Sequence, residues 1–178
     1  MEKSGPASAL TVRKATLEDA SSYAACHITC WQEAYADIVP ADFSSRMAAK
    51  KEEYVAYYRE CLAEPGDCEY LCVLDGPRMA GFVIINRSAV TEYPGAREIW
   101  AIYLREAYWG RGHGQGLLDF AVTQLRPLGA QTVFLWVFER NHRARRFYEK
   151  NGFRFDGIVR EADYGGSVHQ LRYTLALT

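Results

Sequence analysis

The chain has 178 residues, of which 49% are apolar and 24% are charged. This balance is typical of a globular protein, and a chain of this length buries enough surface to fold without disulfide bonds or a structural metal, which excludes disorder as its main state. The 21 basic and 22 acidic residues give a net charge of −1, which argues against nucleic acid and membrane as partners.

The first nine residues lack the apolar segment of a signal peptide, so we expect a flexible leader over residues 1–9 and a single domain over residues 10–178. The five cysteines are odd in number, and their spacing matches neither a CxxC motif nor a zinc site. We therefore expect reduced thiols in a cytoplasmic protein that has no metal site.

The N-terminal part of the chain predicts two helices. Thr16 to Asp19 resembles a capping box, and apolar residues then recur every three or four positions until the pattern ends near Pro40. A second helical pattern covers roughly residues 48–63 and stops at Pro65. Both helices would precede the sheet.

The strands begin with a predicted hairpin over residues 69–74 and 79–86, whose turn is formed by residues 75–77. Residues 98–104 are apolar on both faces, which is typical of a central buried strand. The continuous apolar run over residues 133–138 indicates a parallel strand, and a helix between these two strands would complete a crossover.

The C-terminal part predicts a short helix and a final strand pair. Asn141 is a suitable N-cap, and Gly152 supplies the left-handed position after the helix. The two closing strands are expected over residues 153–158 and 169–177.

Four glycines alternate at positions 110, 112, 114 and 116, between the predicted central strand and the helix of the crossover. Glycine lets backbone amides approach an anion closely, and a helix N-terminus adds unpaired N–H groups, so this loop is expected to bind phosphate. The spacing fits neither a dinucleotide fingerprint nor a Walker loop, so a different diphosphate ligand is indicated.

This loop resembles the Arg/Gln-x-x-Gly-x-Gly/Ala motif of the GNAT superfamily of N-acetyltransferases. The motif can be matched in two registers, Trp109–Gly114 or Arg111–Gly116. We prefer the first, because it keeps Leu117 and Leu118 where the family has an apolar pair, although it places Trp109 where the family has Arg or Gln.

The resemblance implies an α/β (α+β mixed) fold with a mixed, mostly antiparallel sheet, one parallel strand-helix-strand crossover and helices on both faces. It also implies acetyl-CoA as cosubstrate, with the pyrophosphate on the loop and the pantetheine arm along residues 102–104. The implied coenzyme-binding residues are Ile102, Tyr103, Leu104, Trp109, Gly110, Arg111, Gly112, His113, Gly114, Gln115, Gly116, Asn141, Ala144 and Tyr148.

A second stretch, Asn141-x-x-Ala144-x-x-Phe147-Tyr148, strengthens the resemblance. In such proteins the Asn contacts the pantetheine arm and the Tyr protonates the departing thiolate, which would make Tyr148 the general acid. The alternatives are a plain N-cap for Asn141 and a core aromatic for Tyr148. Glu98 has the spacing at which some family members carry a general base, and the alternative there is a surface carboxylate at a strand end.

Four arginines, Arg140, Arg143, Arg145 and Arg146, form a basic cluster beside this stretch. They are either a solvated helix face or, for Arg143 or Arg145, partners of the coenzyme phosphates. The resemblance places the acceptor between the first helices and the last strand pair, with Trp31, Tyr35 and Asp163 as candidate substrate-binding residues and Gln32, Tyr57 and the loop to Gly166 beside them. Core packing is the alternative for Trp31 and Tyr35.

The resemblance thus implies an acetyl-CoA-dependent N-acetyltransferase that acts on a primary amine of a small molecule or peptide, by direct attack in a ternary complex. It also allows a homodimer. Two alternatives stay open: a CoA-binding sensor on the same fold, and a transferase for a longer acyl-CoA.

Overall fold

A computed structural model describes residues 10–177 of the chain, so the leader expected over residues 1–9 lies outside the described residues. The helices, including three short 3-10 helices (η), are η1 Leu17–Asp19, α1 Ala20–Tyr35, α2 Ala41–Ala49, α3 Lys51–Ala63, η2 Glu106–Tyr108, α4 His113–Leu125, η3 Arg126–Leu128 and α5 His142–Lys150. The strands are β1 Thr11–Lys14, β2 Cys68–Asp75, β3 Arg78–Asn86, β4 Ala96–Leu104, β5 Thr132–Phe138, β6 Arg154–Asp163 and β7 Ser167–Ala176.

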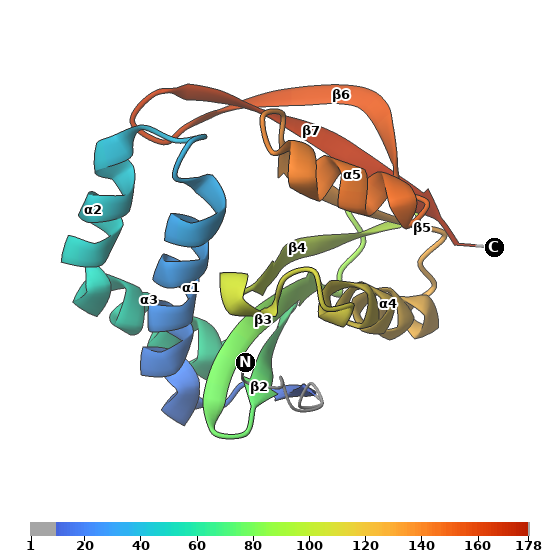
Figure 1. Cartoon of the computed structure of the whole chain (residues 1–178). Coiled ribbons are helices and arrows are strands. Elements are labelled where there is room, and N and C mark those ends of the chain that lie inside the picture. Colours follow the sequence, from blue (N-terminus) through green and yellow to red (C-terminus); the bar gives the residue numbers. More distant parts are fainter. Residues whose placement is uncertain (1–9, 178) are drawn as a thin grey trace, which may run out of the picture.

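The strands form one sheet in the order β1-β2-β3-β4-β5-β7-β6, in which β4 and β5 are the parallel pair and the other neighbours are antiparallel (Figure 1). The mixed, mostly antiparallel sheet with one strand-helix-strand crossover is therefore confirmed. The crossover runs from β4 through α4 to β5, because parallel neighbours need a long connection.

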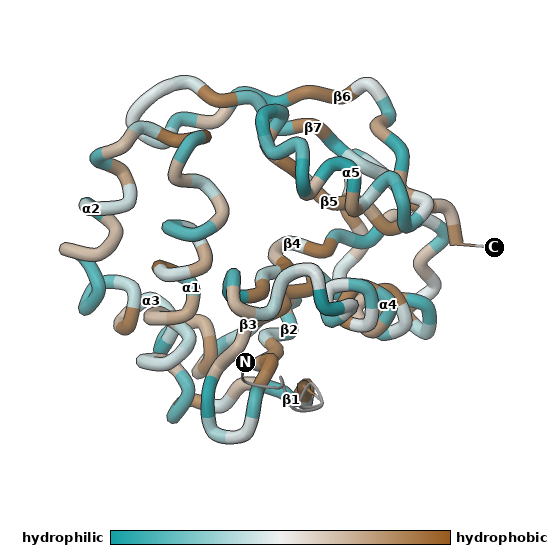
Figure 2. The backbone as a smooth tube through the Cα atoms, viewed as in Figure 1, coloured by the Kyte–Doolittle hydropathy of each residue, from teal (hydrophilic) through white to brown (hydrophobic). Residues whose placement is uncertain are grey.

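Two apolar cores lie on opposite faces of the sheet. One joins α4 and α5 to the strands and includes Leu118 and Phe153, while the other joins α1 and α3 to β2 and β3 and includes Tyr23 and Tyr58. Figure 2 shows hydrophobic colour along the central strands and hydrophilic colour along much of α5. Among residues 10–177, no helix is long and apolar enough to cross a membrane.

The N-terminal prediction was incomplete. The structure adds the strand β1 and the separate helix α2, and the helix expected over residues 48–63 is α3, which begins at Lys51 after Lys50. β1 is a short edge strand with little burial, so hydrophobic alternation does not reveal it. Helix α2 begins directly after Pro40, which the sequence had suggested only as a helix end.

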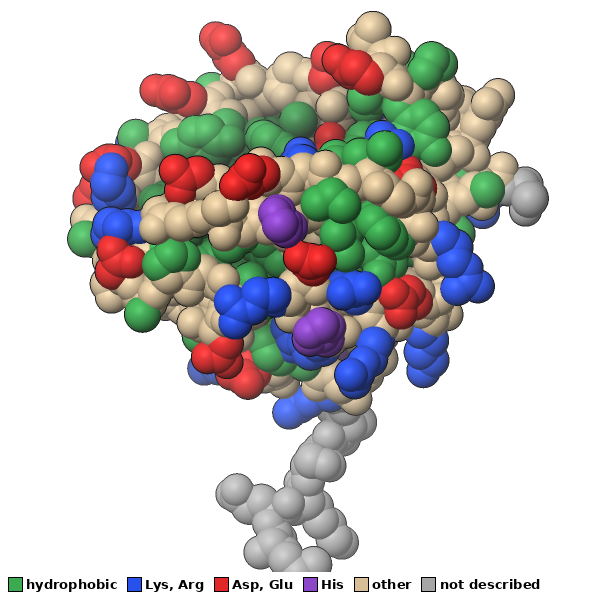
Figure 3. All heavy atoms as spheres, turned by 90° about the horizontal axis from the view of Figure 1, so that it is seen from above, with side chains coloured by type: hydrophobic (Ala, Val, Ile, Leu, Met, Phe, Trp, Pro, Cys, Tyr) green, Lys and Arg blue, Asp and Glu red, His purple; other side chains and the backbone are tan. Residues whose placement is uncertain are grey.

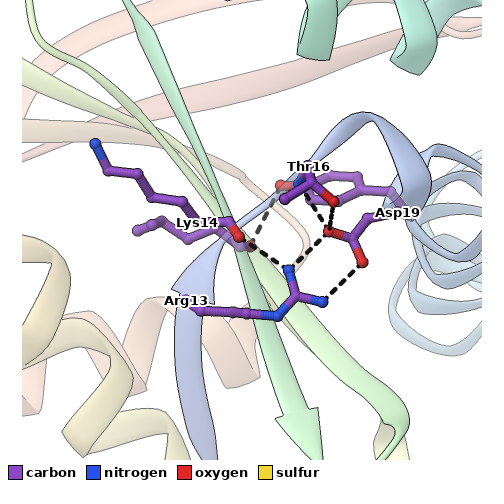
Figure 4. Close-up of polar contacts among 6 residues, drawn as sticks. Arg13, Lys14, Thr16 and Asp19 are labelled. Carbon is purple, nitrogen blue, oxygen red and sulfur yellow. Dashed lines mark hydrogen bonds and ion pairs between the residues drawn. The ribbon is translucent and has the colours of Figure 1, made fainter.

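Polar contacts fix the corner between β1 and α1 (Figure 4). The Arg13 guanidinium donates to both carboxylate oxygens of Asp19, at 2.7 and 2.8 Å, and the Thr16 backbone N–H donates to Asp19 Oδ2 at 2.7 Å. The hydrogen bonds from Arg13 and Thr16 hold the pKa of the Asp19 carboxyl well below its ordinary value. The capping box expected at Thr16 is therefore confirmed.

The central strand was placed correctly, but it is not buried on both faces throughout. Trp100 is 51% exposed, since a bulge leaves it without a partner between the pairs Ile84 with Ala101 and Ile85 with Ile99. β4 pairs with β5 only over Ala96–Glu98. The second half of β4 is therefore free of β5 and can form the wall of a site.

The final strand pair exists but is longer than expected, with β6 over Arg154–Asp163 and β7 over Ser167–Ala176. β6 is an edge strand and is almost wholly exposed, so its sequence carries little apolar pattern. Figure 3, which views the molecule from above, shows hydrophobic side chains at the surface among acidic and basic ones.

Candidate active site

The glycine loop connects β4 to α4. Gly110 and Gly112 have φ values of +70° and +83°, a backbone region that other L-residues rarely adopt, and Gly112 is the N-cap of α4. The first N–H groups of α4 have no helical carbonyls one turn before them to bond with, and the positive end of the helix dipole lies at the same place. The local sequence therefore produces a backbone site suited to an anion.

A cavity of about 420 Å³, which we call the loop cavity, opens beside this helix start. Its wall comes from the end of β4, the glycine loop, the first turn of α4, and α5. The lining residues are Ile102, Leu104, Tyr108, Trp109, Gly110, Gly112, Gly114, Gln115, Leu117, Arg143, Ala144, Phe147, Tyr148, Lys150 and Asn151.

Most of the implied coenzyme residues meet at this cavity, but five do not line it: Tyr103, Arg111, His113, Gly116 and Asn141. The register Trp109–Gly114 has both of its motif glycines, Gly112 and Gly114, in the wall. The register Arg111–Gly116 would need Gly116, which is outside the wall.

Asn141 begins α5, where its side-chain oxygen accepts a hydrogen bond from the Ala144 N–H at 3.1 Å. The N-cap role given as its alternative is thus present. Tyr148, on the inner face of α5, is only 8% exposed, and burial raises the pKa of its hydroxyl well above the ordinary value. The phenol is therefore protonated at neutral pH and can donate a proton.

Trp109 and Arg143 form a stacked pair in the wall of the loop cavity. The Arg143 guanidinium lies 3.1 Å from the centroid of the Trp109 ring, and Trp109 Nε1 donates to the Leu104 carbonyl at 2.7 Å. Burial lowers the pKa of Arg143. Arg145 does not line this cavity, because its side chain donates to Tyr173 Oη and to the Glu139 carbonyl instead.

A hydroxyl pair that the sequence did not indicate lies close to Tyr148. The Oη atoms of Tyr35 and Tyr103 are 2.8 Å apart, and Tyr35 and Arg143 are the electrostatic neighbours of Tyr148. Tyr103 was expected to contribute only its backbone, whereas its side chain packs on the α1 face of the sheet, stacked on Phe82 at 5.0 Å. An aromatic residue in an all-apolar strand gave no signal of this role.

Glu98 lies near the middle of the sheet, paired with Asn86 of β3 and with Phe134 of β5. Burial raises the pKa of its carboxyl, and the nearby charge of Arg160 lowers it in part. Arg160 itself stacks on Trp136, 4.1 Å from the ring centroid. Glu98 is therefore a partly buried carboxyl and not a surface one, but it does not line the loop cavity that contains Tyr148.

A second cavity of about 520 Å³ lies between α1, α2, α3 and the turn from β6 to β7. Because most of its wall is aromatic, we call it the aromatic cavity. Its lining residues are His27, Trp31, Phe43, Met47, Lys50, Glu53, Tyr54, Tyr57 and Tyr164.

Of the candidate acceptor residues, Trp31, Tyr57 and the loop residue Tyr164 line the aromatic cavity, whereas Gln32, Tyr35 and Asp163 do not. The Asp163 carboxylate accepts hydrogen bonds from the N–H groups of Gly165 and Gly166 at 2.8 and 3.0 Å, which stabilises the turn. Tyr35 packs between Trp31 and Phe138 with ring centroids 4.8 and 4.7 Å away.

Glu33, a carboxylate on α1, is hydrogen-bonded to the residues that precede the glycine loop. It accepts hydrogen bonds from Arg105 Nε at 3.0 Å and from the Glu106 N–H at 2.7 Å. This contact ties α1 to the loop. Within residues 10–177 no group of three His, Cys, Asp or Glu side chains is arranged to hold a metal ion.

Comparison with known proteins gives consistent results for the fold. The chain is 30% identical over 134 residues to the uncharacterized N-acetyltransferase YuaI of Bacillus subtilis, which covers 74% of this chain and 73% of that protein. It is 34% identical over 87 residues to the mycothiol acetyltransferase of Corynebacterium glutamicum, covering 49% of this chain and 28% of that enzyme. Among solved structures, the PaiA N-acetyltransferase of Thermoplasma acidophilum in complex with coenzyme A superposes with a TM-score of 0.70 at 22% identity, covering 95% of this chain and 99% of that one.

The family model described as the Acetyltransferase (GNAT) family matches residues 31–153, which contain the lining of both cavities except for His27 and Tyr164. The glycine loop and the stretch from Asn141 to Tyr148, which carried the resemblance, both fall inside the matched region. The chain belongs to the acetyltransferase (GNAT) family.

Proposed function

We propose that this protein transfers the acetyl group of acetyl-CoA to a primary amine of a small molecule or peptide. The observation that carries the proposal is the loop cavity, which combines a left-handed glycine N-cap, the amides of the first turn of α4 and the buried hydroxyl of Tyr148 in one wall. The Thermoplasma enzyme with the same fold was solved with coenzyme A bound.

The residues present fit the diphosphate of this cosubstrate. A Cβ added at Gly110 or Gly112 would meet no protein atom within 4 Å, so packing leaves the space beside these glycines open to a ligand. The backbone N–H groups of the first turn of α4 would donate to the phosphate oxygens. Arg143, in the same wall, adds a positive charge at the cavity.

Acetyl-CoA supplies a thioester that an amine can attack directly, without a covalent enzyme intermediate. In that step the amine nitrogen bonds to the acetyl carbon, the carbon–sulfur bond breaks, and the thiolate needs a proton. Tyr148 supplies that proton, because it lies in the wall of the same cavity and its hydroxyl is protonated at neutral pH. The amine nitrogen loses its proton to the Glu98 carboxylate, either directly or through a chain of water molecules that leads to Glu98.

The proposal is tested by incubating the protein with acetyl-CoA and a panel of amines while free thiol is measured. Polyamines, amino acids, aminoglycosides, arylalkylamines and short peptides cover the main classes. We expect amine-dependent thiol release with at least one class, together with stoichiometric binding of coenzyme A in a calorimetric titration. Absence of binding at millimolar coenzyme would exclude the proposed function.

A further inference from the structure

The lining of the aromatic cavity indicates which kind of acceptor would fit it. Three of its rings, Trp31, Phe43 and Tyr164, pack against one another, with centroid separations of 5.5 Å (Trp31–Phe43), 5.2 Å (Trp31–Tyr164) and 5.4 Å (Phe43–Tyr164). Phe43 and Tyr164 meet at 90°, the edge-to-face arrangement that aromatic rings favour. Tyr54 and Tyr57 extend this wall from α3.

The formal charges of the residues that line the aromatic cavity sum to zero. Its two charged residues, Lys50 and Glu53, pair with each other at 3.1 Å. Burial lowers the pKa of His27 to about 4, so this ring is neutral at pH 7, and its Nδ1 is 2.8 Å from Tyr58 Oη. A polyamine would need unpaired carboxylates, and a dicarboxylate would need unpaired cations; the lining provides neither.

One ring of the wall is open to a ligand. Tyr57 is 44% exposed, so part of its side chain is not covered by the protein. The Nε1 donor of Trp31 is buried and has no hydrogen-bond partner among residues 10–177, so Trp31 offers the cavity its apolar ring and not this donor.

The aromatic wall continues toward the proposed general acid. Trp31 packs edge-on against Tyr35 at 4.8 Å, Tyr35 shares a hydrogen bond with Tyr103, and Tyr148 has Tyr35 as an electrostatic neighbour. A ligand whose ring lies in the aromatic cavity would therefore need an arm to carry its amine past this wall.

We propose that the acceptor is an arylalkylamine, with its ring in the aromatic cavity and its primary amine on a short alkyl arm. The inference rests on the proposed function and narrows its acceptor. Rings that line the aromatic cavity contact the aryl group, and the neutral lining favours an uncharged group at that end. The amine at the other end remains the nucleophile described above.

The test compares 2-phenylethylamine with butylamine and spermidine as acceptors, at saturating acetyl-CoA. We expect kcat/KM for 2-phenylethylamine to exceed both others by about tenfold or more, since burial of a ring is worth at least that factor. Phenylalkylamines with arms of one to four methylenes then measure the length of the arm. Spermidine or butylamine as the better acceptor would overturn the inference.

A matched pair of variants locates the effect. Tyr57→Leu removes an exposed ring of the aromatic cavity, and Phe155→Leu removes a ring of nearly equal exposure, 43%, on β6 outside both cavities. We expect Tyr57→Leu to reduce the preference for 2-phenylethylamine over butylamine about fivefold or more, and Phe155→Leu to leave it unchanged. Equal effects of the two changes, or none from Tyr57→Leu, would contradict the placement of the ring.

Failure of this inference is distinguishable from failure of the proposed function. Acetylation of another class of amine, with 2-phenylethylamine inert, leaves the function intact and refutes the acceptor. If no amine reacts, ligand-observed NMR with 2-phenylethylamine decides: binding to the native protein that Tyr57→Leu weakens supports the aromatic cavity as its site, and absence of binding refutes it. Coenzyme titration then judges the function separately.

Discussion

The loop cavity takes part of its wall from backbone at Gly110, Gly112 and Gly114, whereas the aromatic cavity has no glycine in its lining and is walled by side chains of three helices and one turn. Under the proposed function, the first holds a diphosphate through backbone N–H groups, which every residue except proline provides. The second is built for shape and apolar surface, which depend on the particular side chains present.

The two cavities also differ in how the chain assembles them. Residues 102–117 and 143–151 supply the loop cavity, so two short stretches suffice. The aromatic cavity combines residues 27–57, which lie between β1 and β2 in the chain, with Tyr164, which lies between β6 and β7. A change in the loop cavity should therefore alter use of the cosubstrate, and a change in the aromatic cavity should alter the choice of acceptor.

The sharpest test of the backbone role is the pair Gly114→Val and Gly116→Val. Both positions lie in the first turn of α4, so the change in helix propensity from glycine to valine is similar. A Cβ at Gly114 would be 3.5 Å from the Phe147 ring, an ordinary contact, and at Gly116 it would meet nothing within 4 Å. Only Gly114 lines the loop cavity, so we expect about 10²-fold weaker coenzyme binding for Gly114→Val alone, measured by calorimetry.

Thermal unfolding of the two variants provides the control. Similar melting temperatures with different affinities would assign the loss to the ligand site. Equal affinity of both variants for coenzyme A would show that the loop does not hold the diphosphate, and the contrast between a backbone cavity and a side-chain cavity would fail.

The acid role is tested by Tyr148→Phe against Tyr173→Phe. Loss of the Tyr148 hydroxyl should slow kcat by about 10², a typical general-acid contribution, while coenzyme binding is retained because the ring still packs. Tyr173 Oη is 2.6 Å from Glu149 and 3.1 Å from Arg145, so its loss should cost about 1 kcal/mol of stability and little activity. Full activity of Tyr148→Phe with a verified amine would exclude the acid role.

The sequence predicted the loop cavity better than it predicted the aromatic cavity. The alternating glycines and the stretch after Asn141 predicted the loop cavity. Both are local motifs, which can be recognised from residue type and spacing along the chain. Of the residues that line the aromatic cavity, the sequence pointed only to Trp31, Tyr57 and Tyr164. Phe43 lies in α2, which the sequence did not indicate, and Tyr54 was taken only as part of an apolar helix pattern.

The errors in the fold have related causes. The pattern of residues 98–104 predicted burial but could not show that a bulge at Trp100 and a short pairing with β5 would open the strand to solvent. Asp163 stays a prediction as an acceptor residue, and what the sequence did not show is that its side chain is hydrogen-bonded within the turn to β7. Both outcomes depend on partners distant in sequence or on loop geometry, which a local pattern does not contain.

Glu98→Gln tests whether Glu98 is the general base in the reaction in which Tyr148 is the proposed acid. The amide cannot accept the proton of the amine, so we expect about tenfold lower kcat/KM near neutral pH and a rising limb of the pH profile at higher pH. An unchanged profile would exclude Glu98 as the base. A double variant with Tyr148→Phe is informative as well, since two groups that act in one step should show non-additive losses.

Stability gives an independent readout for this residue. Burial raises the pKa of Glu98 above its ordinary value of 4.5, so the folded state holds the proton more tightly and stability falls as pH rises from 4.5 through the raised pKa. Glu98→Gln removes this loss, and the variant should be more stable than the native protein at pH 7 and similar to it below pH 4.5. A destabilised variant at pH 7 would indicate instead that the carboxylate holds the strands together.

The smallest effect on activity is expected outside both cavities, at the Asp19 corner. Its pKa lies well below the ordinary value of 3.8, so its contribution to stability is present above pH 3.8 and is lost as pH falls through the depressed pKa. Asp19→Asn should cost about 1 kcal/mol at neutral pH, a modest figure because the Arg13 side chain is 46% exposed, and the cost should shrink in acid. Asp42→Asn, which breaks a more exposed pair with Arg46 on α2, should change stability by less, and both variants should keep the native kcat/KM. Urea unfolding at pH 7 and pH 3 measures the difference, and an altered preference among amines for Asp19→Asn would contradict the assignment of acceptor choice to the aromatic cavity.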